Sequence, residues 1–154
     1  MSDIISSEVP ILVAMGAYWR DGLVLGIRRA QRSNYPGFWT FPGGKREYEE
    51  TMLATLVREF SEEAGLHVIA VRAKVDVTQY TRGEMAYGHE VPQSCRVTCF
   101  TITEAAGLCR GVEEGTAAGW FTASEMLKLD LIPSVRAYLE KNWVGSGQSY
   151  LGNR

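Results

Sequence analysis

Apolar stretches along the chain predict several β-strands. Residues 11–19 and 23–27 are apolar and rich in strand-forming side chains, and Asp21-Gly22 lies between them. An Asp-Gly pair between two apolar runs is typical of a β-hairpin. Residues 81–94 are polar and contain glycines and a proline, which predicts a loop. Further apolar stretches predict strands at residues 39–41 (stopped by Pro42-Gly43-Gly44), 67–80, 95–103 and 120–121.

A helical period of apolar positions predicts a helix over residues 51–64. Thr51 is a suitable N-cap residue, and Gly65 stands where a helix often ends in a left-handed glycine. Two more helices are predicted, one near Glu125 and one over residues 135–142. The positions of the first helix expected to face a core are Leu53, Leu56, Val57, Phe60 and Ala64.

Strands and helices follow one another irregularly, which predicts an α+β fold, an αβα sandwich with a mixed sheet flanked by helices. The chain has 154 residues, 45% of them hydrophobic and 22% charged, as in an average soluble domain. We therefore expect one domain over residues 9–142, between a flexible N-terminus (1–8) and a flexible C-terminal tail (143–154).

Charge and cysteine content exclude several classes of protein. The net charge is −2, so no non-specific binding to nucleic acid is expected. No apolar run is long enough to cross a bilayer, and the first residues carry no base of a secretory signal. The three cysteines form no Cys-x-x-Cys pair, which favours a reducing, cytoplasmic location over a disulfide-bonded one.

The most unusual feature is an acidic segment over residues 47–66. It holds six of the eighteen acids and a single base, Arg58. At about 100° per residue, Glu62 and Glu63 lie within roughly 60° of Glu59 on the predicted helix, beside its apolar stripe. Like charges on one face and at the C-terminal end of a helix are unfavourable. Either this is a solvated acidic helix, or a hard divalent cation offsets the repulsion.

The spacing of these residues is familiar. The pattern Gly44-x5-Glu50-x7-Arg58-Glu59-Phe60-x-Glu62-Glu63-x-Gly65-Leu66 resembles the Nudix box, with every fixed position matched. The preceding Trp39-Thr-Phe-Pro-Gly-Gly-Lys45 resembles the segment that leads into the box in the MutT-type branch of Nudix hydrolases. The resemblance covers residues 9–142 and is most specific at residues 39–66.

The resemblance implies an enzyme that cleaves a nucleoside diphosphate linked to a group X with Mg²⁺ or Mn²⁺. It implies that the catalytic residues are the box glutamates and Arg58, which would orient one of these glutamates. The implied metal ligands are Glu59, Glu62, Glu63 and the carbonyl of Gly43. Further candidates for a supporting metal ligand or a base are Glu50, Glu113 and Glu114.

Substrate contacts are expected outside the box. Arg29, with Arg28 beside it, resembles the arginine pair of the family and is a candidate phosphate contact. Lys45 is a further candidate for binding the substrate. Trp39 and Phe41 could stack on a base or belong to the core. Ser134 follows a proline at the place where members that read oxidised guanine carry asparagine. A serine has one hydroxyl, whereas an amide offers paired donor and acceptor groups, so specificity for oxidised guanine is less well supported.

The sequence therefore predicts a divalent-metal-dependent pyrophosphohydrolase that cleaves a nucleoside triphosphate, or another nucleoside diphosphate linked to X, to a nucleoside monophosphate and pyrophosphate. Two alternatives stay open. One is a Nudix enzyme for a dinucleotide, nucleotide sugar or coenzyme A derivative, and the other is a non-catalytic module that senses a nucleotide. The partner is expected to be a small nucleotide, with no membrane. A homodimer is also predicted, because the long apolar strand that begins at residue 9 would be an unprotected edge.

Overall fold

The computed structural model describes residues 9–30, 35–80, 84–86, 89–91, 94–109 and 117–142. The chain begins with the expected hairpin, formed by β1 (Ile11–Arg20) and β2 (Leu23–Arg28). Trp19 pairs with Val24 across the turn. Asp21 and Gly22 both have positive φ, 52° and 79°, as a tight hairpin turn of this kind requires.

Seven strands of the described chain form one sheet with the order β3-β2-β1-β8-β5, in which β4 also pairs with β1 and β9 with β2. β1 and β8 run parallel, and the other pairs are antiparallel, so the sheet is mixed. This confirms the α+β prediction. The remaining strands are β3 (Trp39–Thr40), β4 (Gly43–Lys45), β5 (His67–Tyr80), β8 (Ser94–Ala106) and β9 (Ala117–Phe121).

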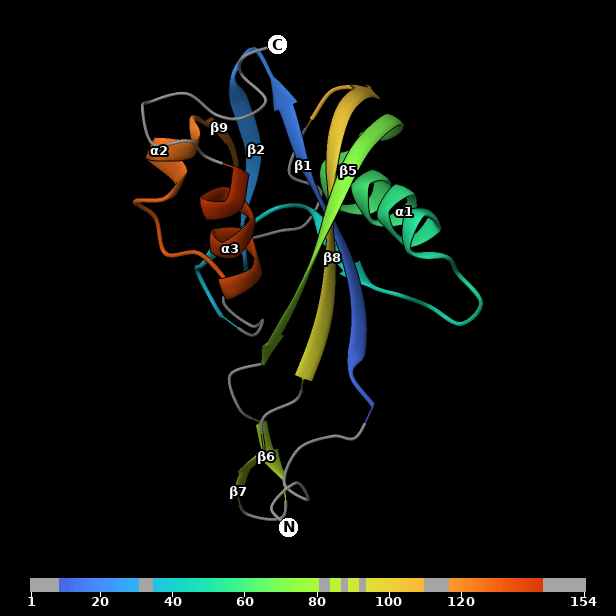
Figure 1. Cartoon of the computed structure of the whole chain (residues 1–154), viewed down its shortest axis with the longest axis vertical. Coiled ribbons are helices and arrows are strands. Elements are labelled where there is room, and N and C mark those ends of the chain that lie inside the picture. Colours follow the sequence, from blue (N-terminus) through green and yellow to red (C-terminus); the bar gives the residue numbers. More distant parts are fainter. Residues whose placement is uncertain are drawn as a thin grey trace.

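Helices cover both faces of the sheet, with α1 on one side and α2 and α3 on the other (Figure 1). Alternate residues of β1 divide between the two cores: Ala14 packs on the α1 side and Met15 on the α3 side. The bounds of the helices are Met52–Ala64 for α1, Ala123–Met126 for α2 and Pro133–Asn142 for α3. Within the part of the chain that is described, no helix has the length and apolar character that spanning a membrane requires.

The structure differs from the predicted elements in three details. Residues 42–44 were expected to end a strand, but Gly43 begins β4, which pairs with β1. The loop expected over residues 81–94 contains β6 (Glu84–Ala86) and β7 (His89–Val91), whose three-residue strands are too short to show a period. Leu53 is 44% exposed, whereas Thr55 of the same helix is fully buried.

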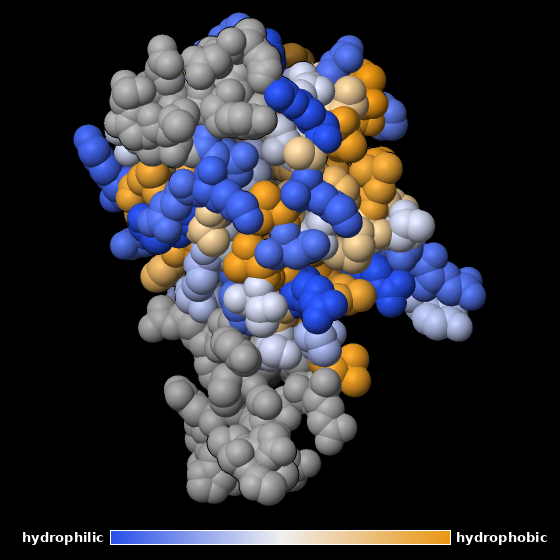
Figure 2. Space-filling model, viewed as in Figure 1, coloured by the Kyte–Doolittle hydropathy of each residue, from blue (hydrophilic) through white to orange (hydrophobic). Residues whose placement is uncertain are grey.

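The edge-strand argument for a homodimer is also wrong. β1 lies inside the sheet, because it pairs with β2 and β4 along one edge and with β8 along the other. The outer strand on that side of the sheet is β5. The surface of the molecule is mostly hydrophilic in the view of Figure 2, with smaller apolar areas between the charged side chains.

Candidate functional site

Helix α1 carries the acidic residues and is defined at both ends as the sequence predicted. The Thr51 side chain accepts a hydrogen bond from the backbone N–H of Ala54 at 3.0 Å, and Gly65 has a φ of 71° at the C-terminal end. No basic residue occupies the last turn, which holds Glu62 and Glu63. The helix dipole therefore disfavours both carboxylates where they stand.

Glu50 and Arg58 form the central ion pair of the site. Arg58 Nε donates to Glu50 Oε2 at 2.7 Å, and Arg58 Nη2 donates to Glu50 Oε1 at 3.0 Å. Glu50 Oε1 also accepts from the backbone N–H of Glu47 at 2.9 Å and from the Thr55 hydroxyl at 2.8 Å. Both oxygens of Glu50 are thus engaged, and the carboxylate fastens the preceding loop to α1.

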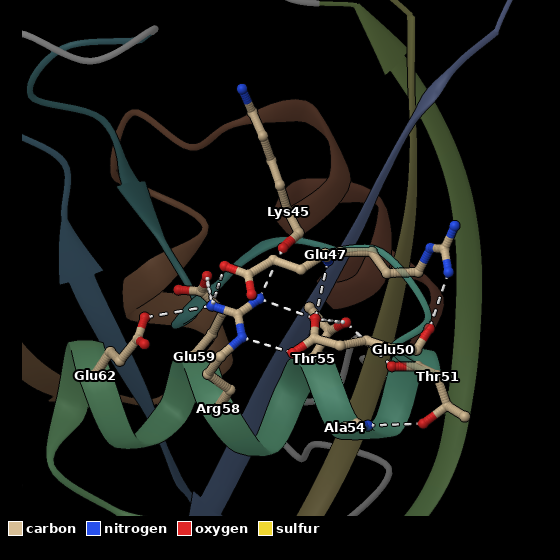
Figure 3. A network of polar contacts seen from close by, with 10 residues as sticks. Lys45, Glu47, Glu50, Thr51, Ala54, Thr55, Arg58, Glu59 and Glu62 are labelled. Carbon is tan, nitrogen blue, oxygen red and sulfur yellow. Dashed lines mark hydrogen bonds and ion pairs between the residues drawn. The ribbon is translucent and has the colours of Figure 1, made fainter.

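The rest of the Arg58 guanidinium faces the other acids, as Figure 3 shows. Nη1 donates to Glu59 Oε2 at 2.9 Å and to Glu62 Oε1 at 3.4 Å, and it lies 3.6 Å from Glu47 Oε2. Nη2 donates to the backbone carbonyl of Lys45 at 3.0 Å, which connects the helix to β4. The guanidinium of Arg58 therefore holds these carboxylates close to one another.

The pKa values of the acids reflect these contacts. Hydrogen bonding from Arg58 is the main cause that lowers the pKa of Glu50, to about 2. Burial is the main cause that raises the pKa of Glu59, although Arg58 acts in the opposite direction. The paired acids raise the already high pKa of Arg58 further. Glu50 is consequently a fixed anion at neutral pH, whereas Glu59 binds a proton more readily than an ordinary glutamate.

The Glu50 pKa predicts a pH-dependent stability. A lowered folded-state pKa stabilises the fold above the ordinary pKa of glutamate, 4.5, and that contribution disappears as the pH falls toward 2. We expect the melting temperature of the parent to fall more steeply between these pH values than that of Glu50→Gln. Thermal melts of both proteins across this range test the expectation, and parallel curves would contradict it.

The two glycines of β4 allow the strand to lie directly against α1. The backbone N–H of Gly43 donates to Glu63 Oε1 at 2.9 Å. A Cβ on Gly44 would stand only 2.3 Å from the carboxylate carbon of Glu59, so a side chain there would displace that carboxylate. A Cβ on Gly43 would instead meet backbone, 2.3 Å from the carbonyl oxygen of Ala14. The strand therefore presents bare backbone to Glu59 and Glu63.

The structure brings together most of the residues expected in the metal and catalytic set. Within the described ranges, no three His, Cys, Asp or Glu side chains converge closely enough to hold a metal ion as they stand. The reason is that Glu59 and Glu62 turn toward Arg58, and Glu63 turns toward Gly43. Glu113 and Glu114 lie outside the described residues.

The expected substrate residues separate into two groups. Phe41 is 1% exposed and stacks edge-on against Tyr138, which places it in the core. Ser134 is also fully buried, and its hydroxyl faces Met15 Sδ at 3.9 Å. Trp39 is half-buried and packs against Phe121. The expected residues that reach the surface most freely are Arg28 and Lys45, with Arg29 half-buried.

Sequence reasoning did not single out Thr55, which hydrogen bonds to Glu50, or Gln79, whose side chain accepts from the backbone of α3. A polar residue on the buried stripe of a predicted helix is a signal that could have indicated Thr55. No pattern in the chain connects Gln79 with residue 134, because the contact joins strand and helix 55 positions apart.

Comparison with known proteins agrees with this geometry. Residues 10–141 match the sequence model of the NUDIX domain. The chain belongs to this family. The Nudix domain is 30% identical over 124 residues to the CTP pyrophosphohydrolase of Escherichia coli, covering 79% of this chain and 82% of that protein. It is 35% identical over 91 residues to the 8-oxo-dGTP diphosphatase of Proteus vulgaris, covering 54% and 72%.

A solved structure supports the same assignment. The MutT NUDIX hydrolase from Burkholderia pseudomallei superimposes on this Nudix domain with a TM-score of 0.70 and 28% sequence identity, covering 86% of this chain and 98% of that one. The chain is therefore a Nudix hydrolase. Enzymes of this family generally need a divalent metal and act on small nucleotide substrates.

Proposed function

We propose that this Nudix hydrolase is a pyrophosphohydrolase that cleaves a nucleoside triphosphate to a nucleoside monophosphate and pyrophosphate. The observation that carries the proposal is the position of Glu59 and Glu63 against the bare glycine backbone of β4, with Glu62 beside Glu59 on the same Arg58 guanidinium. The names of the curated relatives point to nucleoside triphosphates as substrates. Because one name specifies CTP and the other 8-oxo-dGTP, the names leave the base open.

The residues present fit a hard divalent cation, which we propose to be Mg²⁺ or Mn²⁺. Carboxylate oxygens are the ligands such ions prefer, and the glycine strand leaves no side chain between its backbone and Glu59. The residues that would hold the ion are Glu59, Glu62 and Glu63, with the Gly43 carbonyl. When bound, the ion would neutralise phosphate charge and lower the pKa of a coordinated water.

The remaining residues of the network act on the protein itself. Arg58 holds Glu50 in a bidentate pair and fixes β4 through the Lys45 carbonyl, so the helix and the strand keep a constant spacing. Glu50, whose oxygens are both engaged, serves in this proposal as an anchor for Arg58. Lys45 and Arg29 are the proposed contacts for substrate phosphates, since both are cations and Lys45 belongs to β4, the strand that packs against the carboxylates.

A hydrolysis panel tests this function. Nucleoside triphosphates, a nucleotide sugar, a dinucleoside polyphosphate and a coenzyme A derivative would each be incubated with the protein and Mg²⁺, and the products separated. We expect a nucleoside monophosphate and pyrophosphate from at least one triphosphate. A monophosphate with a phosphorylated group X would instead favour the first alternative. Turnover of none of these compounds would contradict the proposal and favour a nucleotide-sensing module.

A further inference from the structure

Gln79, near the end of β5, is held in one orientation by helix α3. Its Oε1 accepts a hydrogen bond from the backbone N–H of Ser134 at 2.8 Å. That N–H is one of the first donors of α3 and has no partner within the helix. Because a backbone N–H can only donate, the oxygen of the carboxamide must face Ser134. The NH₂ group of Gln79 then points away from the helix, and it has no hydrogen-bond partner among the described residues.

Lys45, on β4, lies on the α3 side of the sheet, because it pairs with Val13, which packs on that side. Its backbone carbonyl accepts from Arg58 on the carboxylate side, while its side chain points away from the carboxylates (Figure 3). The charge of Lys45 acts on the Cys95 thiol, whose pKa burial raises and Lys45 lowers. Cys95 is the residue that pairs with Gln79 across β8 and β5. In the sheet, Lys45 on β4 and Gln79 on β5 therefore lie on opposite sides of β8, the strand that carries Cys95.

The surface between these two groups suits a nucleoside. Ile11 pairs with Cys95, and Val13 pairs with Lys45; both are half-buried apolar residues on the α3 side of the sheet. β4 and β5 are separated by β1 and β8, so at about 4.8 Å per strand their backbones are roughly 14 Å apart. Small-molecule sites combine apolar side chains with a few fixed polar groups, which is the composition found here.

We propose that Gln79 determines the base specificity of the hydrolase, by donating from its NH₂ group to the carbonyl at C6 of a purine or C4 of a pyrimidine. This inference rests on the proposed function, which places the phosphates near Lys45 and β4. A fixed donor pairs with the O6 or O4 carbonyl of guanine or uracil and opposes the amino group of adenine or cytosine. The enzyme therefore prefers keto bases to amino bases. The Ser134 hydroxyl takes no part, because it is buried against Met15.

The substitution Gln79→Glu changes the proposed contact with the base and keeps the hydrogen bond to the first turn of α3. One carboxylate oxygen still accepts from Ser134 N–H, while the other replaces the NH₂ donor by an acceptor. We expect the ratio of kcat/KM for GTP and UTP over ATP and CTP to fall by about tenfold, since the keto bases lose a hydrogen bond and meet an acceptor in its place. Gln79→Leu removes both bonds, and we expect it to abolish the preference and lower the melting temperature.

A matched control adds the same charge to the opposite face of the strand. Thr78 is exposed and points away from the α3 side, so Thr78→Glu is expected to leave the base ratio unchanged. Calorimetric binding of GMP, UMP, AMP and CMP gives the same comparison without turnover, so it tests the inference even if hydrolysis is not found. A parent preference for amino bases, or a ratio that neither Gln79 variant changes, would overturn the inference. If Gln79→Leu lowers only the melting temperature, Gln79 merely supports α3.

Discussion

Replacing Glu63 by glutamine is expected to reduce hydrolysis by about 100-fold or more, because the substitution removes a charged ligand from the proposed metal set. The stability of the fold should not decrease. The oxygen of glutamine can still accept from the Gly43 N–H, which Glu63 Oε1 now does at 2.9 Å. The variant also loses a like charge one helical turn from Glu59 and an anion in the last turn of α1. The free energy of unfolding should therefore rise by up to about 1 kcal/mol or stay constant.

Three measurements check this result: kcat/KM with Mg²⁺, chemical unfolding without metal, and the rise in melting temperature on adding Mg²⁺. The rise should be larger for the parent, because a ligand stabilises a protein according to its affinity for the native state. Glu49→Gln is a suitable control, since Glu49 is exposed and lies outside the Arg58 network. Turnover close to that of the parent, or a loss of several kcal/mol in stability, would contradict the role proposed for Glu63.

Alanine substitutions at the two neighbouring glycines of β4 are expected to have different effects on stability and activity. In Gly43→Ala the new Cβ meets the backbone of Ala14 and the Cβ of Met15, at 2.3 and 2.5 Å, so the pairing of β4 with β1 must open. We expect a loss of about 1–3 kcal/mol in the free energy of unfolding. In Gly44→Ala the three atoms nearest to the new Cβ all belong to the carboxylate end of Glu59, which can rotate away. Stability should change little.

Catalytic activity should be affected most in the variant whose stability changes least. Displacing the Glu59 carboxylate by about 1 Å is expected to cost Gly44→Ala roughly 100-fold in kcat/KM, because misplaced groups lose the orientation that catalysis needs. Urea unfolding and initial-rate kinetics on both proteins test the pair. Equal losses of stability in the two variants, with full activity in folded Gly44→Ala, would show that the strand has only a structural role.

The sequence predicts the helix that carries the acids because its signals are local. Thr51 and Gly65 stand at the positions where the structure begins and ends α1. The shared face of the glutamates follows from the helical period alone. The partner of Arg58 is different: Glu50 lies before the helix, and only the folded loop over residues 46–50 brings its carboxylate to the guanidinium. Glu49 adopts a φ of 68° in this loop, a conformation that is uncommon for glutamate and that the sequence does not predict.

The contacts that sequence reasoning missed are those between distant segments. Gly43 and Gly44 are typical of a turn, and their pairing with β1 depends on the backbone of Ala14 approaching without a side chain between them. Ser134 was a reasonable candidate for contact with substrate by its position after Pro133. Its burial follows from the packing of α3 on the sheet, which places Gln79 rather than the serine hydroxyl at the surface.

The carboxylate network and both glycines come from one uninterrupted stretch, residues 43–63, whereas the Gln79 contact requires β5 and α3 from later in the chain. The residues proposed to break the anhydride are thus encoded separately from the residue proposed to choose the base. If Gln79 reads the base as proposed, a substitution there changes which nucleotide is accepted and leaves the carboxylate network intact. Exchange of β5 and α3 between members of the family is therefore a rational way to transfer substrate preference onto an unchanged reaction centre.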